Sequence, residues 1–284
     1  MTFKTNDLIK ENLRCLICNE SFVNISQNGV ICKNNHNFII DEGVFVLETK
    51  LKLQEKYRWG KKLRNPKENL LLDKSQSTMA KEKSRIRMEN MINFIVSNAK
   101  KESTDVLDIA TGRGLLIRKL LPEINNSTIY LTDLDTDVLV GTNKLIGNLK
   151  RNNITIPIAS SATHLPFTDN FISEVTCFGI NNIRETKAAI TEVRRVLKPK
   201  GKLIFSFSLM ECGSPSQLWL LTQEDKPGPF DIIDKWQDET ENIGFEILRR
   251  EILFDGPVEK AELDLLPREN GERFQDIGVI LLKN

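Results

Sequence analysis

An apolar segment at positions 106–109 leads into a loop with two glycines, after which apolar residues recur at helical spacing. The short apolar run predicts a buried strand. Gly112 and Gly114 permit a tight turn and a close approach of the backbone to a ligand. The apolar positions of residues 115–121 predict a helix whose N-terminus faces that ligand. The pattern therefore predicts a strand, a ligand-binding loop and a helix in succession.

Four further segments predict elements of regular structure. Residues 84–99 carry apolar side chains at helical spacing, which predicts a helix packed against a sheet. The apolar residues 129–131 predict a second strand that ends at Asp133. Residues 243–254 and 275–284 predict two late strands.

The composition leaves room for a second unit beside one full domain. The chain has 284 residues, of which 40% are hydrophobic and 28% are charged. One domain of ordinary size leaves roughly 80–100 residues over. No apolar run approaches the roughly 20 residues of a membrane span, and the N-terminus lacks the apolar region of a signal peptide. We therefore expect a cytoplasmic protein without membrane contact.

Three cysteines and one of the two histidines have the spacing of a metal site. Cys15, Cys18, Cys32 and His36 follow the pattern C-x2-C-x13-C-x3-H. Two such pairs of ligands can complete a tetrahedron around Zn2+. Disulfides are not expected in a reducing compartment. Three buried cysteines beside a surface histidine remain the alternative.

A metal site with four protein ligands has no open position for substrate, so the predicted zinc is structural. It would fold a unit at residues 1–48 that is too small to fold alone. Residues 49–83 are expected to form a basic helical connector, because positions 51–90 hold twelve Lys or Arg and five Asp or Glu. Such a stretch can contact RNA. It can equally be a solvated connector, or pair with residues 231–284, which hold fourteen acidic and seven basic side chains.

The glycine loop resembles motif I of the class I methyltransferases that use S-adenosylmethionine (SAM), D/E-x-G-x-G-x-G. Asp108, Gly112 and Gly114 match this motif, and Ala110 stands where the family has its first glycine. The competing dinucleotide-binding motif, G-x-G-x-x-G, fits the loop less well. SAM carries no phosphate, so a carboxylate in the loop does not repel it. The resemblance implies that the loop holds the methionine end of SAM.

Three downstream segments extend the resemblance. Asp133 stands where the family binds the ribose hydroxyls. Residues 160–180 resemble the D-A-x-x-L-P-F stretch of the family, with Ser161 in place of the aspartate that holds the adenine amino group and Ala162 beside the adenine ring. Residues 192–207 resemble the E-x-x-R-V-L-K-P-G-G-x-L segment. The resemblance implies a cofactor site formed by Asp108, Ala110, Gly112, Gly114, Asp133, Leu134, Ser161, Ala162 and Phe178.

The N-terminal segment resembles the zinc ribbons that precede some bacterial methyltransferase domains. Among these are the 23S rRNA guanine-N1 methyltransferases, whose cysteine spacing and H-x-F and E-G-x-V patterns recur here at residues 36–38 and 42–44. The proline common after the first cysteine is Leu16 in this chain. This resemblance makes methylation of rRNA guanine one alternative to methylation of a small molecule.

The expected architecture is a doubly wound, Rossmann-like α/β domain with a seven-stranded methyltransferase sheet at residues 84–284, behind a small zinc ribbon. The expected activity is methyl transfer from SAM to an acceptor that the sequence does not name. The catalytic residue stays unknown, because in-line transfer needs alignment of the acceptor more than a fixed set of groups. His164 is the only histidine outside the metal pattern, and the resemblance puts it on the cofactor side. A non-catalytic SAM-binding module that acts through its ribbon is the second alternative.

Overall fold

The computed structural model describes residues 3–47, 82–223, 226–259 and 268–284, and the predicted connector at 49–83 lies outside them except for its last two positions. The strands are β1 (Phe22–Ile25), β2 (Gly29–Cys32), β3 (Asn37–Asp41), β4 (Val44–Val46), β5 (Asp105–Ile109), β6 (Thr128–Asp133), β7 (Ile154–Ala159), β8 (Ile172–Phe178), β9 (Leu197–Met210), β10 (Phe245–Pro257) and β11 (Arg273–Lys283). The α-helices are α1 (Phe3–Asn12), α4 (Glu82–Asn98), α5 (Leu115–Leu120), α6 (Thr136–Leu145), α7 (Thr186–Val196), α8 (Pro215–Leu221) and α9 (Trp236–Ile243).

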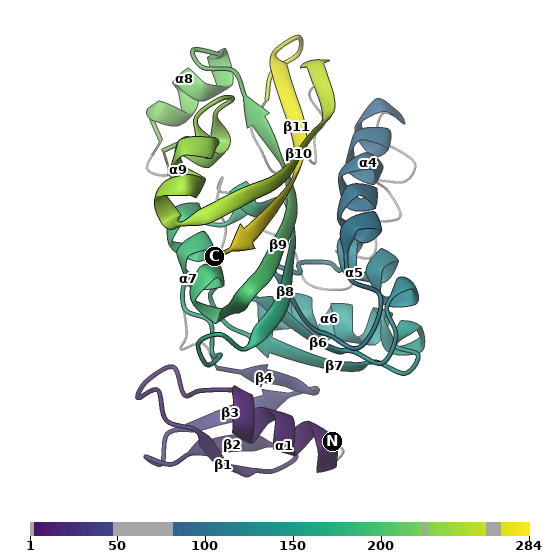
Figure 1. Cartoon of the computed structure of the whole chain (residues 1–284), viewed down its shortest axis with the longest axis vertical. Coiled ribbons are helices and arrows are strands. Elements are labelled where there is room, and N and C mark those ends of the chain that lie inside the picture. The colour runs from purple at the N-terminus through teal and green to yellow at the C-terminus, as the bar shows by residue number, and fades with distance from the viewer. Residues whose placement is uncertain (1–2, 48–81, 224–225, 260–267) are drawn as a thin grey trace.

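These strands form one sheet in the order β1-β2-β3-β4-β7-β6-β5-β8-β9-β11-β10. The central strands from β4 to β9 pair in parallel, whereas β11 runs antiparallel to both β9 and β10. The strands predicted at 106–109 and 129–131 are β5 and β6, and the two predicted late strands are β10 and β11. β10 and β11 pair antiparallel at one end of the strand order (Figure 1).

The sheet is larger than expected. Strands β5–β11 are the seven that the sequence predicts, but β1–β4 continue the same sheet beyond β7. Phe45 and Val46 of β4 pair in parallel with Ile158 and Ala159 of β7. An open sheet edge leaves a row of backbone N–H and C=O groups without partners, and β4 supplies partners along β7. The expectation of a seven-stranded sheet is therefore wrong, because the N-terminal segment closes one of its edges.

Helices cover both faces of the sheet, because successive side chains of a strand point to opposite sides. Leu107 and Tyr130 pack in a cluster with buried side chains of α1, α7 and α9. Val106 and Ile129 face the other way and pack with buried side chains of α5 and α6. The predicted doubly wound α/β arrangement is confirmed (Figure 1).

Helix α4 is the helix predicted at 84–99, and its stripe of Met91, Ile92 and Ile95 is buried as expected. A buried ion pair fastens this helix to the last strand of the chain. The Nε and Nη2 atoms of Arg87 each donate to a carboxylate oxygen of Asp276 at 2.7 Å. Asp276 is 1% exposed, so the pair is shielded from water on the side of β11.

We expect Arg87→Met to lower the free energy of unfolding by about 3–5 kcal/mol, because Asp276 would stay buried without its cationic partner. Arg85→Met is the matched control on the same helix, since it removes an exposed pair with Glu89. Its effect should stay below about 1 kcal/mol. Urea denaturation followed by circular dichroism measures both values, and equal effects would contradict the anchoring role of Arg87.

Candidate functional site

The loop between β5 and α5 has a left-handed backbone at three positions. Ala110, Gly112 and Gly114 have φ angles of 50°, 53° and 73°. A Cβ atom on Gly114 would lie 2.8 Å from the Thr142 side chain, so packing against α6 requires this glycine. Within 4 Å of a Cβ atom on Gly112 lies only the Ala110 carbonyl oxygen, at a distance of 3.7 Å. Gly112 is therefore the position where the loop backbone is open to an incoming ligand.

The carboxylate at the end of β6 lies directly against this loop. Asp133 accepts a hydrogen bond from the Gly112 N–H at 2.9 Å through Oδ2, and one from the Asp135 N–H at 3.0 Å through Oδ1. The side chain is half-buried. The structure thus brings together the two motifs that the sequence assigns to one cofactor. It places a carboxylate, which is a hydrogen-bond acceptor, beside Gly112.

A third loop, residues 160–168, follows β7 at the same end of the sheet. The Ser160 N–H donates to the Asp133 carbonyl oxygen at 3.0 Å, which joins this loop to the end of β6. The hydroxyls of Ser161 and Thr163 lie 2.7 Å apart, and Ala162 is buried. His164 is exposed, and its N–H bonds the Ser161 carbonyl oxygen.

Helix α7 braces this loop through two charged side chains that the sequence motifs did not assign to the site. Glu192 accepts from the Leu165 N–H at 2.9 Å. Arg195 donates to the carbonyl oxygens of Leu165 and Phe167 at 2.9 and 2.7 Å. Both residues belong to the E-x-x-R part of the motif at 192–207. The sequence therefore contained the signal but did not show that these side chains support the loop. These residues fix the loop backbone rather than face a ligand.

The other predicted residues have different surroundings. Asp108 is 1% exposed and accepts from the Thr176 hydroxyl at 2.8 Å. Burial raises its pKa from 3.8 to about 7, although hydrogen bonds from Thr176 and Thr111 work in the opposite direction. Leu134 is half-buried, and so is Phe178, which packs in the cluster that holds α4. Asp108 therefore lies in the strand layer beneath the loop.

All these residues lie at or just beyond the carboxyl ends of the adjacent parallel strands β7, β6, β5 and β8. Ligands of open α/β sheets bind in the crevice beyond the carboxyl ends of the strands. The arrangement offers an open glycine backbone, a carboxylate acceptor and a pair of hydroxyls within one group of loops. These are groups that can bind a ligand with an amino acid part and a ribose.

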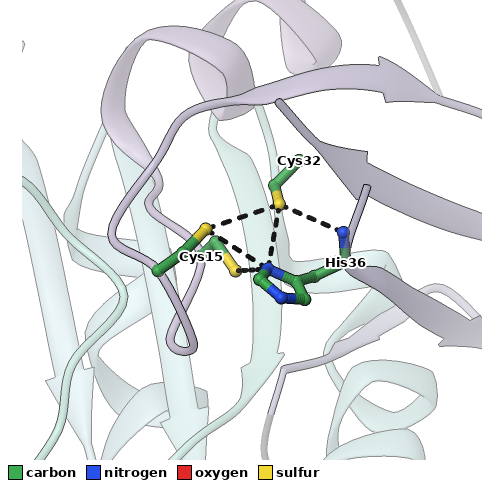
Figure 2. A group of neighbouring side chains, drawn as sticks. Cys15, Cys32 and His36 are labelled. Carbon is green, nitrogen blue, oxygen red and sulfur yellow. Dashed lines mark hydrogen bonds between the residues drawn. The ribbon is translucent and has the colours of Figure 1, made fainter. Parts of the chain in front are cut away.

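A second group of side chains meets in the N-terminal unit, defined here as residues 3–47. Cys15 and Cys18 lie between α1 and β1, Cys32 ends β2, and His36 precedes β3. Their four ligand atoms all lie within 4.8 Å of one another. Figure 2 shows the sulfur atoms of Cys15 and Cys32 turned toward the His36 ring. The sequence pattern thus becomes a compact cluster.

The distances within this cluster suit a tetrahedral Zn2+ ion. Zn–S bonds of about 2.3 Å and Zn–N bonds of about 2.0 Å place the ligand atoms of a tetrahedron about 3.8 Å apart for two sulfurs and about 3.5 Å apart for sulfur and nitrogen. The Cys18 and Cys32 sulfurs lie 3.7 Å apart. The Nδ1 atom of His36 lies 3.3–3.6 Å from the three sulfurs. The donor set therefore fits a closed zinc site.

The two thiols of the first pair have opposite pKa shifts. Burial raises the pKa of Cys15 to about 11. Burial also acts on Cys18, but the backbone N–H of Glu20 and the His36 side chain outweigh it and lower the pKa of Cys18 to about 7. Thiolates are the form that binds zinc. Cys18 thus reaches this form most readily of the two.

Comparison with known proteins gives the family. Residues 72–221, just over half of the chain, match the ubiE/COQ5 methyltransferase family. The chain belongs to this family. The predicted class, a SAM-dependent methyltransferase enzyme, is confirmed at the level of the family, and the matched residues include the glycine loop, Asp133 and the 160–168 loop.

Curated relatives from this family share part of the chain. The ubiquinone/menaquinone biosynthesis C-methyltransferase UbiE of Cupriavidus pinatubonensis is 37% identical over 108 residues, which cover 36% of this chain and 43% of the relative. The protein of the same name from Chromobacterium violaceum gives the same identity and the same coverage. The chain therefore matches less than half the length of these relatives.

Solved structures confirm the fold. A putative methyltransferase from Bacillus halodurans has a TM-score of 0.53 at 19% identity, over 68% of this chain and 98% of that protein. A chain from the complex between the Haloferax volcanii Trm112 methyltransferase activator and a putative methyltransferase has a TM-score of 0.51 at 13% identity, over 76% of this chain and 98% of the other. At these identities the likeness concerns the fold alone.

Two finer predictions gain no support from the comparisons. The relatives named above bear the name of a quinone pathway, and similarity to rRNA guanine-N1 methyltransferases is not confirmed. A zinc ribbon domain is not confirmed either, and the metal prediction rests on the Cys/His cluster. Within the described ranges, no helix is both long enough and apolar enough to cross a membrane.

The pKa of Asp108 predicts a pH dependence of stability. The folded state keeps its proton up to about pH 7, whereas the unfolded state loses it near about pH 4. The free energy of unfolding should therefore fall as pH rises between these values. Asp108→Asn removes this contribution, so its stability relative to the wild type should increase with pH across the same window.

Urea denaturation at about pH 5 and about pH 8 measures this difference, with Asp137→Asn on the exposed start of α6 as the control. The control variant should show the same pH dependence as the wild type. A constant difference between Asp108→Asn and the wild type would show that Asp108 is ionised throughout this range.

Proposed function

We propose that this protein transfers a methyl group from SAM to a small-molecule acceptor. The observation that carries the proposal is the contact between the Asp133 carboxylate and the Gly112 N–H at the carboxyl ends of β6 and β5. It puts a carboxylate beside the one loop glycine that leaves space for a ligand. Both residues lie in the region that matches the methyltransferase family.

The loops would divide the binding of SAM between them. The open backbone at Gly112, between Ala110 and Gly114, suits the methionine end. Asp133 would accept hydrogen bonds from the ribose hydroxyls through its carboxylate oxygens. Ser161 and Ala162 would border the adenine, with Leu134 and Phe178 as apolar walls. Asp108 would support the loop from below, through its bond to Thr176.

When bound, SAM supplies a methyl group that a sulfonium ion already activates. The residues of this chain then have to align an acceptor with that methyl group and exclude water. Such alignment needs no dedicated nucleophile, and we assign no catalytic residue. His164 is exposed at the adenine side of the proposed site, which does not suit a base acting on the acceptor.

The choice of a small-molecule acceptor follows the relatives. Those with 37% identity are named for ubiquinone and menaquinone biosynthesis. The matched segment covers 36% of this chain, so the proposal extends to the class of acceptor and not to a particular quinone precursor. A cytoplasmic location belongs to the same proposal.

We further propose that Cys15, Cys18, Cys32 and His36 hold one structural Zn2+. The support is the spacing of their ligand atoms, all within 4.8 Å of one another. Four protein ligands leave no coordination position for substrate, so the ion would stabilise the fold and take no part in methyl transfer. The N-terminal unit would depend on it, because its own core is small.

The acceptor class can be tested with methyl-tritiated SAM in an extract of the host cells, with and without ribonuclease. We expect label in low-mass material that ribonuclease does not affect.

Asp133→Asn should lower SAM affinity about 10- to 150-fold, because the loss of hydrogen bonds to a charged acceptor costs about 1.5–3 kcal/mol. Isothermal titration calorimetry measures that affinity in parallel.

Asp137→Asn is the matched control, because Asp137 is an exposed aspartate four residues further on, in the first turn of α6. It should bind SAM as the wild type does.

In the labelling experiment, label in ribonuclease-sensitive, high-mass material would identify RNA, and not a small molecule, as the acceptor. SAM binding without any transfer would favour the non-catalytic alternative.

The metal proposal predicts one zinc per chain in the purified wild-type protein, by elemental analysis and native mass spectrometry. Cys32→Ser removes a buried member of the proposed ligand set and should release the ion. Cys212→Ser changes an exposed cysteine outside the cluster and should keep it. Zinc retained at full occupancy by Cys32→Ser would contradict the proposed ligand set.

A further inference from the structure

Backbone hydrogen bonds join the N-terminal unit to the far end of the 160–168 loop. The Arg14 N–H donates to the Pro166 carbonyl oxygen at 2.9 Å, and the Thr168 N–H donates to the Asn12 carbonyl oxygen at 3.2 Å. Leu13 and Phe167 form an antiparallel bridge between these bonds. The segment before Cys15 therefore runs alongside the loop like a short additional strand.

The same unit also holds the start of the loop. Strand β4 pairs with the last two residues of β7, Ile158 and Ala159. The Leu47 N–H then donates to the Ala159 carbonyl oxygen at 3.1 Å. Ser160 follows immediately, and with it the loop that carries Ser161 and Ala162. Residues 45–47 thus hold the end of β7 from which the loop starts, and residues 12–14 hold the far end of the loop.

The Cys/His cluster lies next to these contacts along the chain. Cys15 directly follows Arg14, and its N–H bonds the Glu20 carbonyl oxygen to close the first turn of the cluster. Cys15, Leu13 and Phe45 share one buried cluster with Phe167 of the loop. A metal ion held by Cys15 would therefore fix the segment that supports the loop.

Helix α7 supports the loop from its other side through Glu192 and Arg195. The loop is thus held by α7, by the bond from Ser160 to Asp133 of β6 and by the N-terminal unit, and of these three the N-terminal unit contains the Cys/His cluster. Without zinc, the N-terminal unit would lose the metal–ligand bonds that join Cys15 and Cys18 to Cys32 and His36. Small units of this kind take much of their folding free energy from the metal. Only the contacts of the loop with α7 and with the end of β6 would then remain.

We propose that the N-terminal unit positions the 160–168 loop for SAM, so that zinc occupancy sets the affinity of the chain for SAM. This inference rests on the proposed function, because it assigns a role to the metal in that same cofactor site. Leu13, Arg14 and Phe45 are positioning residues in this scheme, because they act through the backbone of the loop and of β7. Because coupling between two binding sites is reciprocal, bound SAM must tighten zinc by the same factor.

The first experiment compares the full-length chain with zinc, after chelation, and after zinc is added back. Titration calorimetry should give a SAM affinity that falls about 5- to 150-fold without zinc, the range common for coupled sites, and recovers on reloading. Competition with a chelating dye should show zinc held more tightly in saturating SAM by the same factor. Circular dichroism should show that the sheet persists in the zinc-free chain.

A pair of phenylalanine variants separates loop support from metal binding. Phe45→Ala acts at the contact between β4 and β7, where Phe45 is 2% exposed. Phe245→Ala removes an equally buried ring, 3% exposed, at the start of β10 on the opposite sheet edge. Phe45→Ala should keep one zinc per chain and bind SAM more weakly than the wild type. Phe245→Ala should keep one zinc per chain and bind SAM with wild-type affinity.

Each outcome bears on a distinct claim. Equal SAM affinity with and without zinc would overturn the inference and leave the proposed SAM-dependent function intact. Failure of the zinc-loaded chain to bind SAM would overturn the proposed function itself. Collapse of the whole sheet on zinc removal would replace local positioning with global stabilisation. If Phe45→Ala does not fold, the wild-type comparison with and without zinc still decides the inference.

Discussion

Parallel pairing of β5 with β6 is the constraint on which the rest of this site depends. Its register sets Ile109 beside Thr132, so that the glycine loop and the last residue of β6 emerge together at one edge of the sheet. The bond from Gly112 to Asp133 follows from that register. β7 continues it, with Asp133 beside Ala159, and so brings the third loop to the same place. The position of the candidate cofactor site is therefore a consequence of strand register.

The edge of the parallel sheet imposes a second constraint. β7 would present unpaired backbone groups on its outer side, and β4 pairs with its last two residues there. The N-terminal unit is thus part of the same sheet and the same core as the family domain, with Phe22 and Phe38 in one buried cluster with Ile156. Its Cys/His cluster is connected to the loops of the candidate cofactor site through shared packing as well as through the chain.

Hydrogen bonds between segments that are far apart in the chain connect α4, β8, β9 and β11. Arg87 of α4 reaches Asp276 of β11, and Asp276 also accepts from the Ser208 hydroxyl of β9 at 2.5 Å. Asn181, just after β8, donates to the Ser208 carbonyl oxygen at 2.7 Å. These contacts join helix α4, which precedes β5, to β11, the last strand of the chain.

Local sequence patterns determined the elements and the chemistry of the loops. The short apolar runs ending at Ile109 and Asp133, the glycines between them and the cysteine spacing all act within a few residues, and each appears in the structure at its predicted place. The joining of β4 to β7 and the bracing of the 160–168 loop by Glu192 could not be derived in this way, because hydrogen bonds between distant segments leave no periodic signal. Only the tertiary structure decided these contacts, since the register and closure of a sheet depend on every strand that joins it.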